Sequence, residues 1–191
     1  MKTEIVLRTP NINTLNLILY TLNLSSALSK EHTKAQTTKI VQYIGDNKER
    51  FAELMNILFT GDSRISQRAA WPLSICVQQH PELIKPYFKK LIQKMQQPGI
   101  HNGIIRNSLR LLQDVIIPKT WHGTLMNYCF ALIQKHGEPV ANKAFAITIL
   151  DNLSKEYPDI RQELVLVIRE RWDHESAAFK SRGRKVFRDK Y

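Results

Sequence analysis

Apolar residues recur at every third or fourth position in one segment after another from residue 33 onward. The stretch from Gly61 to Gly99 shows this pattern twice, with His80 and Pro81 between the two copies. A period near 3.6 with one apolar stripe per segment is typical of amphipathic helices that bury one face. No segment past residue 33 alternates convincingly with a period of two, so the pattern predicts an all-α protein.

Turn signals divide the pattern into four helix pairs and one last helix. The expected pairs cover about 33–44 with 46–60, 62–79 with 81–97, 102–115 with 119–135, and 139–157 with 159–171, and the last helix covers about 176–190. Asp46 and Glu49 have the spacing of a capping box at the start of the second helix. Pro72 and Pro86 lie inside apolar stripes that continue on both sides, so we expect kinks there and not breaks.

The helix pairs repeat with a period of about 38 residues. Gly61, Gly99 and Gly137 lie 38 positions apart. A basic residue early in the following helix keeps nearly the same step, at Arg68, Arg106, Lys143 and Arg182. Such a period predicts an α-solenoid of about four antiparallel helix pairs, closed by the last helix as a C-terminal cap. Residues 1–30 do not follow the repeat and are predicted as an irregular N-terminal leader or an extra helix before a repeat domain of residues 31–191.

The motif Asp62-x-x-Ile65-x-x-Arg68-Ala69-Ala70-x-x-Leu73 resembles the HEAT repeat of the armadillo-like superfamily. Weaker copies begin at Ile104 and Val140, and the similarity covers about residues 33–190. The resemblance implies a HEAT-like α-solenoid in which the helices that carry the spaced basic residues line a concave face, and it implies nothing about the partner.

The spaced basic residues have a structural and a functional interpretation. In the first, Arg68 reaches back to Asp62 or to turn carbonyls and holds one helix pair against the next, an arrangement that the periodicity favours. In the second, which the resemblance implies, the same residues form a basic stripe on the concave face together with Arg64 and Arg110. The two interpretations can hold at different positions.

The C-terminal segment is a further basic region. Residues 176–191 carry a net charge of +5, whereas residues 138–175 carry a net charge of −3. Arg182, Arg184 and Lys185 are therefore binding candidates, although a solvated cap explains the same composition. Gly183 between two of these residues is consistent with a close backbone approach.

Three tryptophans, Trp71, Trp121 and Trp172, invite comparison with the HEAT-like DNA alkylation-repair glycosylases, which pair aromatic residues with an acidic catalyst. Asp114 and Asp151 occupy equivalent positions late in two leading helices and could supply that carboxylate. Packing of buried aromatic residues is the favoured interpretation, with Trp71 retained as a binding candidate.

Composition narrows the possible partners and compartments. The chain of 191 residues has a formal net charge of +11, which favours an acidic partner such as nucleic acid, anionic lipid or an acidic protein surface. Cys76 and Cys129 lie in apolar stripes, which suggests a reducing cytoplasm. Leu15 to Leu24 is too short and too interrupted for a membrane span, and its flanks only faintly resemble a signal peptide.

These observations predict a monomeric, cytoplasmic, non-enzymatic scaffold that mediates protein–protein interaction through a concave basic surface. The alternative is a nucleic-acid-binding protein, distantly like the alkylation-repair glycosylases. The chain has no histidine pair or cysteine motif with the spacing of zinc ligands and no phosphate-binding glycine motif, so we expect no metal and no cofactor.

Overall fold

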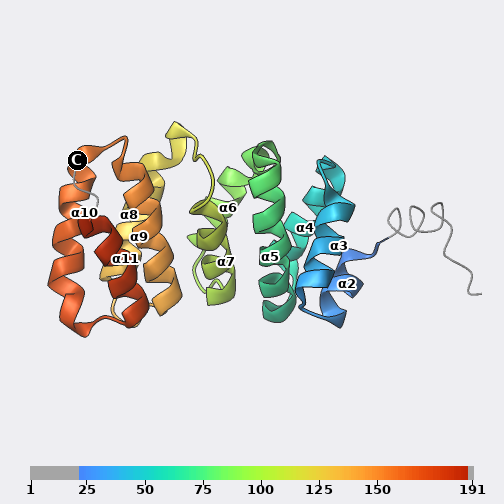
Figure 1. Cartoon of the computed structure of the whole chain (residues 1–191), viewed down its shortest axis with the longest axis horizontal. Coiled ribbons are helices and arrows are strands. Elements are labelled where there is room, and N and C mark those ends of the chain that lie inside the picture. Colours follow the sequence, from blue (N-terminus) through green and yellow to red (C-terminus); the bar gives the residue numbers. More distant parts are fainter. Residues whose placement is uncertain (1–21, 189–191) are drawn as a thin grey trace, which may run out of the picture.

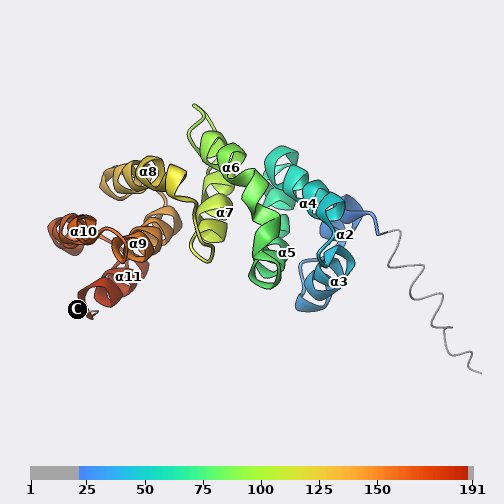
Figure 2. The ribbon, with the colours of Figure 1, turned by 90° about the horizontal axis from the view of Figure 1, so that it is seen from above.

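The computed structural model describes residues 22–188, and this part of the chain folds into ten α-helices without a strand. The helices stand side by side in a row of antiparallel hairpins (Figure 1), and the row is curved when seen from above (Figure 2). Their bounds are α2 Leu24–Lys30, α3 Lys34–Ile44, α4 Lys48–Thr60, α5 Ser63–Gln79, α6 Phe88–Met95, α7 Asn102–Leu112, α8 His122–Gln134, α9 Val140–Ser154, α10 Pro158–Arg171 and α11 Ala177–Arg188. The predicted all-α solenoid of four helix pairs and a terminal helix is confirmed.

The hairpins stack as two layers. Helices α3, α5, α7, α9 and α11 form an inner row on the concave side, and α4, α6, α8 and α10 form an outer row (Figure 2). Each inner helix packs on the next. Small buried residues along this row, such as Ala69, Ser108 and Ala146, allow a close approach between neighbouring inner helices. The row therefore curves toward its inner side.

The core lies between the two rows and runs along the whole stack. Leu54, Leu73, Leu109, Leu150 and Phe179 are fully buried and come from five different helices. Each hairpin alone would leave its apolar stripe in water, so stacking is what buries it. The terminal helix α11 packs on α9 and α10 and covers the end of this core.

The extra helix α2 packs against α5, α3 and α4 at the other end of the stack. Gln36 donates its amide to the carbonyl of Ala27 (2.9 Å), and Arg68 donates to the carbonyls of Leu28 (2.8 Å) and Ser29 (2.9 Å). These bonds satisfy carbonyls that the end of α2 leaves unpaired. The predicted boundary between residues 30 and 31 stays a prediction, and most of the leader lies outside the described residues.

Helix starts follow the sequence signals with one exception. Thr33 and Asp62 cap α3 and α5 through their side-chain oxygens. The predicted capping box at Asp46 is wrong, because the amide oxygen of Asn47 accepts the Arg50 N–H and α4 begins one residue later than that motif requires. Gly45 ends α3 with a positive φ of 50°, a conformation that favours glycine.

The two internal prolines behave differently. Pro72 lies inside α5, which stays continuous from Ser63 to Gln79. Pro86 lies in a 3₁₀ segment, Pro81–Tyr87, and the α-helical part starts only at Phe88. The kink expected at Pro86 within one α-helix is therefore wrong. A proline cannot donate the backbone bond of an α-helix, and here the tighter 3₁₀ turn precedes the α-helix.

Candidate functional site

Charge is distributed unequally between the two rows of helices. The five inner helices contain a single acidic residue, Asp151, which forms an ion pair with Arg161 of α10 (3.1 Å). The basic residues of these inner helices are Lys34, Lys39, Arg64, Arg68, Arg106, Arg110, Lys143, Lys180, Arg182, Arg184, Lys185 and Arg188. The outer row, by contrast, carries acidic residues on α4 and α10. Unpaired charge on the inner row is therefore positive.

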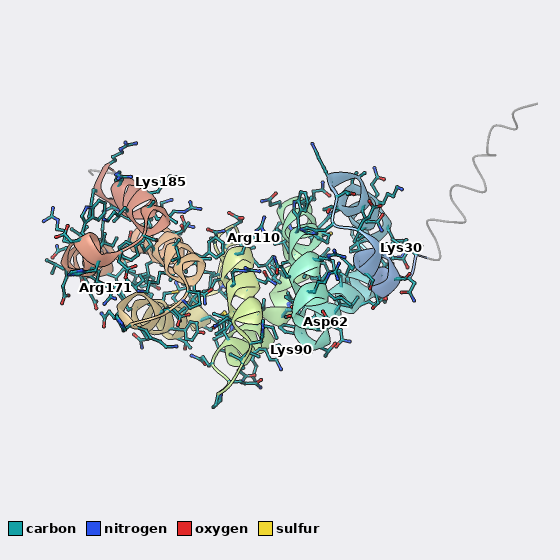
Figure 3. The ribbon with its side chains drawn as sticks, turned by 90° about the horizontal axis from the view of Figure 1, so that it is seen from below. Lys30, Asp62, Lys90, Arg110, Arg171 and Lys185 are labelled. Carbon is teal, nitrogen blue, oxygen red and sulfur yellow. The ribbon has the colours of Figure 1, made fainter. Side chains whose placement is uncertain are left out.

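A hollow of about 430 Å³ lies on the inner row where α5, α7 and α9 meet. Its basic lining residues are Arg106 and Arg110, one helical turn apart on α7. Figure 3 shows Arg110 on the inner side of the curve and Lys90 on the outer side. The remaining lining residues are His32, Gln67, Trp71, Asn107 and Phe145. None of these described residues is acidic, so the hollow presents cationic, aromatic and amide groups together.

A second, smaller hollow of about 240 Å³ continues the first toward the N-terminal ends of the same helices. Gln67 and Arg106 line both hollows, which makes them one groove. Ser63, Asn102 and Pro139 mark the far end of this groove, at the start of α5, α7 and α9. We call the two hollows together the inner groove.

The structure brings three of the predicted site residues together. Trp71, Arg106 and Arg110 line one hollow although they come from two repeats. Neither guanidinium of the two arginines has an ion pair or a hydrogen bond within residues 22–188. Trp71 is half-buried, and its ring meets the imidazole of His32 edge to face, with 5.3 Å between the ring centroids.

Two other candidates hold the fold together. Arg68 binds the end of α2, as described above, and does not bind Asp62, whose carboxylate caps α5. Lys143 is 5% exposed, and its ammonium contacts the Glu175 carboxylate at 2.5 Å. Arg171 binds the same carboxylate oxygen at 3.1 Å. The structural interpretation of the basic repeat therefore applies to Arg68 and Lys143, and their charges are already engaged.

The remaining candidates lie outside the inner groove. Arg64 is exposed in the first turn of α5. Arg182, Arg184 and Lys185 lie on α11, and Lys185 projects on the inner side at the far end of the molecule (Figure 3). The guanidinium of Arg184 stands 5.8 Å from the ring centre of Trp172.

The tryptophans do not form one site. Trp172 packs on Phe187 of α11, and Trp121 lies in a 3₁₀ turn before α8. Asp151 is engaged with Arg161, and Asp114 lines a separate hollow near the C-terminal end of α7. Neither carboxylate accompanies Trp71, so the aromatic and acidic pairing of the alkylation-repair glycosylases is not formed by the described residues.

Sequence reasoning missed four residues of the larger hollow, His32, Gln67, Asn107 and Phe145, and the residues that line the smaller one apart from Arg106. A signal existed for Asn107, because an amide inside the apolar stripe of α7 needs a partner. It is 4% exposed and donates to the carbonyl of Ser66 (3.2 Å), which fixes α7 against α5.

The two cysteines are unsuited to nucleophilic chemistry. Burial raises the pKa of Cys76 to about 12, and burial raises the pKa of Cys129 as well. Both thiols therefore stay protonated near neutral pH. Among residues 22–188 no cluster of three potential metal ligands occurs, and none of the helices there is long and apolar enough to cross a bilayer.

Stacked hairpins with an open inner groove define the class of α-solenoid repeat proteins. A family model described as a HEAT repeat domain matches residues 24–190, and the chain belongs to this family. Domains of this family are generally scaffolds for protein interaction. No curated protein and no solved structure matches the chain.

Proposed function

We propose that this protein is a non-enzymatic scaffold that binds an acidic surface of a partner protein with its inner row of helices. The observation that carries the proposal is the inner groove, where Arg106 and Arg110 lie beside Trp71 without a compensating carboxylate. Arginine binds carboxylates with two parallel N–H donors, and tryptophan and arginine are the residues that most often dominate protein interfaces.

The mechanism is docking on a preformed surface. Asn107 is fixed by the Ser66 carbonyl, and α7 packs on α5 on one side and on α9 on the other, so the walls of the groove are held by the core. A partner carboxylate at Arg106 or Arg110 is then surrounded by Trp71 and Phe145, which exclude water and strengthen the ionic contact.

Binding of nucleic acid is the second candidate, and the basic residues of α11 favour it. Arg182, Arg184 and Lys185 extend the positive charge to the end of the inner row. A nucleic-acid backbone requires several phosphate contacts along its length. Arg68 and Lys143, which stand between the groove and the two ends of the row, are engaged in the fold, and this interruption favours a shorter acidic ligand.

The experiment compares capture of proteins from a nuclease-treated lysate by three forms of the chain. These are the unaltered chain, a double charge reversal in the groove (Arg106→Glu with Arg110→Glu), and a matched reversal of two exposed lysines at the start of the outer helix α6 and in the 3₁₀ segment before it (Lys85→Glu with Lys89→Glu). We expect the groove variant to lose a partner that the other two forms retain. Equal capture by all three forms contradicts the proposal, and ligands captured only from a parallel lysate without nuclease favour nucleic acid.

We propose a cytoplasmic monomer on separate grounds. Cys76 and Cys129 are both free and buried, an arrangement that needs no oxidising compartment. Helices α2 and α11 cover the two ends of the described stack, so its apolar core is closed without a second copy. Sedimentation at several concentrations tests the monomer.

A further inference from the structure

The inner groove has the length of a short extended peptide. From Asn102 to Arg110 the exposed stripe of α7 advances by eight residues, or about 12 Å at about 1.5 Å per residue. An extended chain advances about 3.3 Å per residue, so roughly four residues fill this length. Helices α5 and α9 flank α7 on both sides and form the walls.

The two arginines repeat at the spacing of one face of an extended chain. Arg106 and Arg110 are one turn apart, which separates their positions by about 6 Å along the helix axis. Alternate side chains of an extended peptide point to the same side and stand about 6.6 Å apart. Two acidic side chains separated by one residue therefore match the two guanidiniums, whereas two adjacent acidic side chains point to opposite sides.

The lining also offers partners for a peptide backbone. Gln67 and Asn102 carry amides that both donate and accept, and both residues are exposed in the groove. A peptide needs both kinds of partner because each residue has an N–H and a carbonyl. The phosphate backbone of a nucleic acid has acceptors only, so the acceptor atoms of these amides would stay unused.

From this match, we infer that the inner groove binds an extended segment of the partner protein with acidic side chains at alternate positions, which contact Arg106 and Arg110. The inference rests on the proposed function and names the ligand of the same site. A residue next to the acidic pair packs against Trp71 of α5 and Phe145 of α9, which line the same hollow as the two arginines.

The test uses short synthetic peptides and amide-resolved NMR titration, which also reports that each variant is folded. The first peptide contains Glu-Ala-Glu between glycines, and the second contains Glu-Glu-Ala, with the same composition and charge. We expect the first peptide to bind about fivefold more tightly. In the second peptide the two carboxylates point to opposite sides, so only one of them can contact the arginine pair. Shifts should centre on the amides of α7 and the indole of Trp71.

Variants separate the inference from the proposed function. With Arg106→Gln and Arg110→Gln, the preference for Glu-Ala-Glu should disappear, while Lys85→Gln with Lys89→Gln should keep it. Equal binding of both peptides through the two arginines overturns the alternate-position inference and leaves the proposed function standing. Absence of binding by any acidic peptide, together with unchanged protein capture by the charge-reversal variant, overturns both.

A single-stranded oligonucleotide of about ten nucleotides is the third probe. Weaker binding than the Glu-Ala-Glu peptide supports the inference. Tighter binding that is lost in the Arg106→Gln and Arg110→Gln variant, and that weakens steeply with salt, overturns it in favour of nucleic acid.

Discussion

Replacing Lys143 with methionine should destabilise the fold strongly, although the residue occupies the same place in its repeat as Arg106, which is half-buried and lines the groove. The Lys143 and Glu175 side chains are 6% and 8% exposed, and their charges lie 2.5 Å apart. Removing one member of a buried ion pair costs about 3–5 kcal/mol, because the other charge remains buried. Arg171 still contacts the carboxylate, so we expect the lower end, about 3 kcal/mol.

Urea denaturation followed by circular dichroism measures this loss, and calorimetry should show a melting temperature lower by roughly 6–12 °C for a domain of this size. Glu175→Gln in the Lys143→Met background removes the buried carboxylate charge that has lost its lysine partner. The double variant should therefore be more stable than Lys143→Met alone, which a double-mutant cycle resolves. Arg106→Met is the matched control and should change the free energy of unfolding by less than about 0.5 kcal/mol. A loss below about 1 kcal/mol for Lys143→Met would refute the structural assignment.

Three further predictions concern packing, chemistry and the N-terminal end. A Cβ at Gly183 would lie 2.8 Å from Ile168 and 2.9 Å from Trp172. Gly183→Ala should therefore lower the free energy of unfolding, measured in urea, by about 1–3 kcal/mol. Gly123→Ala is the control and should cause no loss, because a Cβ there meets no atom within 4 Å. Cys76 and Cys129 should react with a thiol reagent at pH 8 only after unfolding, because burial raises both pKa values; rapid labelling of the native chain would contradict this. Arg68→Met should accelerate amide exchange in α2, since two carbonyl contacts are lost.

The fold could be predicted in detail because its information is local and repeated. Each helix has its own apolar stripe, and the glycines at a step of 38 mark where one unit ends. The errors are also local. Asp46 and Asn47 are both good caps, and the sequence alone does not decide which of two neighbouring residues takes the extended conformation. The backbone angle that proline fixes fits both a kinked α-helix and a 3₁₀ turn, so the sequence alone does not decide between them at Pro86.

The site was less predictable because it combines side chains from separate repeats. Trp71, Arg106 and Arg110 could be named from type and spacing, but His32 and Phe145 enter the groove only once the stack brings their segments together. Lys143 shows the limit most clearly. Its partner Glu175 lies 32 residues later, in the connection before α11. The repeat pattern does not extend to this connection, so it could not predict which residue would meet Lys143.

Basic residues at equivalent positions of the repeats differ in whether the fold supplies them with a partner. Arg68 and Lys143 have hydrogen-bond acceptors or a carboxylate where the fold needs them. Arg106 and Arg110 have none among the described residues, and two like charges at positions i and i+4 of a helix destabilise it by about 0.2–0.5 kcal/mol. Folding gains nothing from this repulsion, whereas an acidic ligand removes it and covers the exposed part of Trp71 in the same contact. The uncompensated pair therefore supports the proposed binding role of the groove, because it does not contribute to stability.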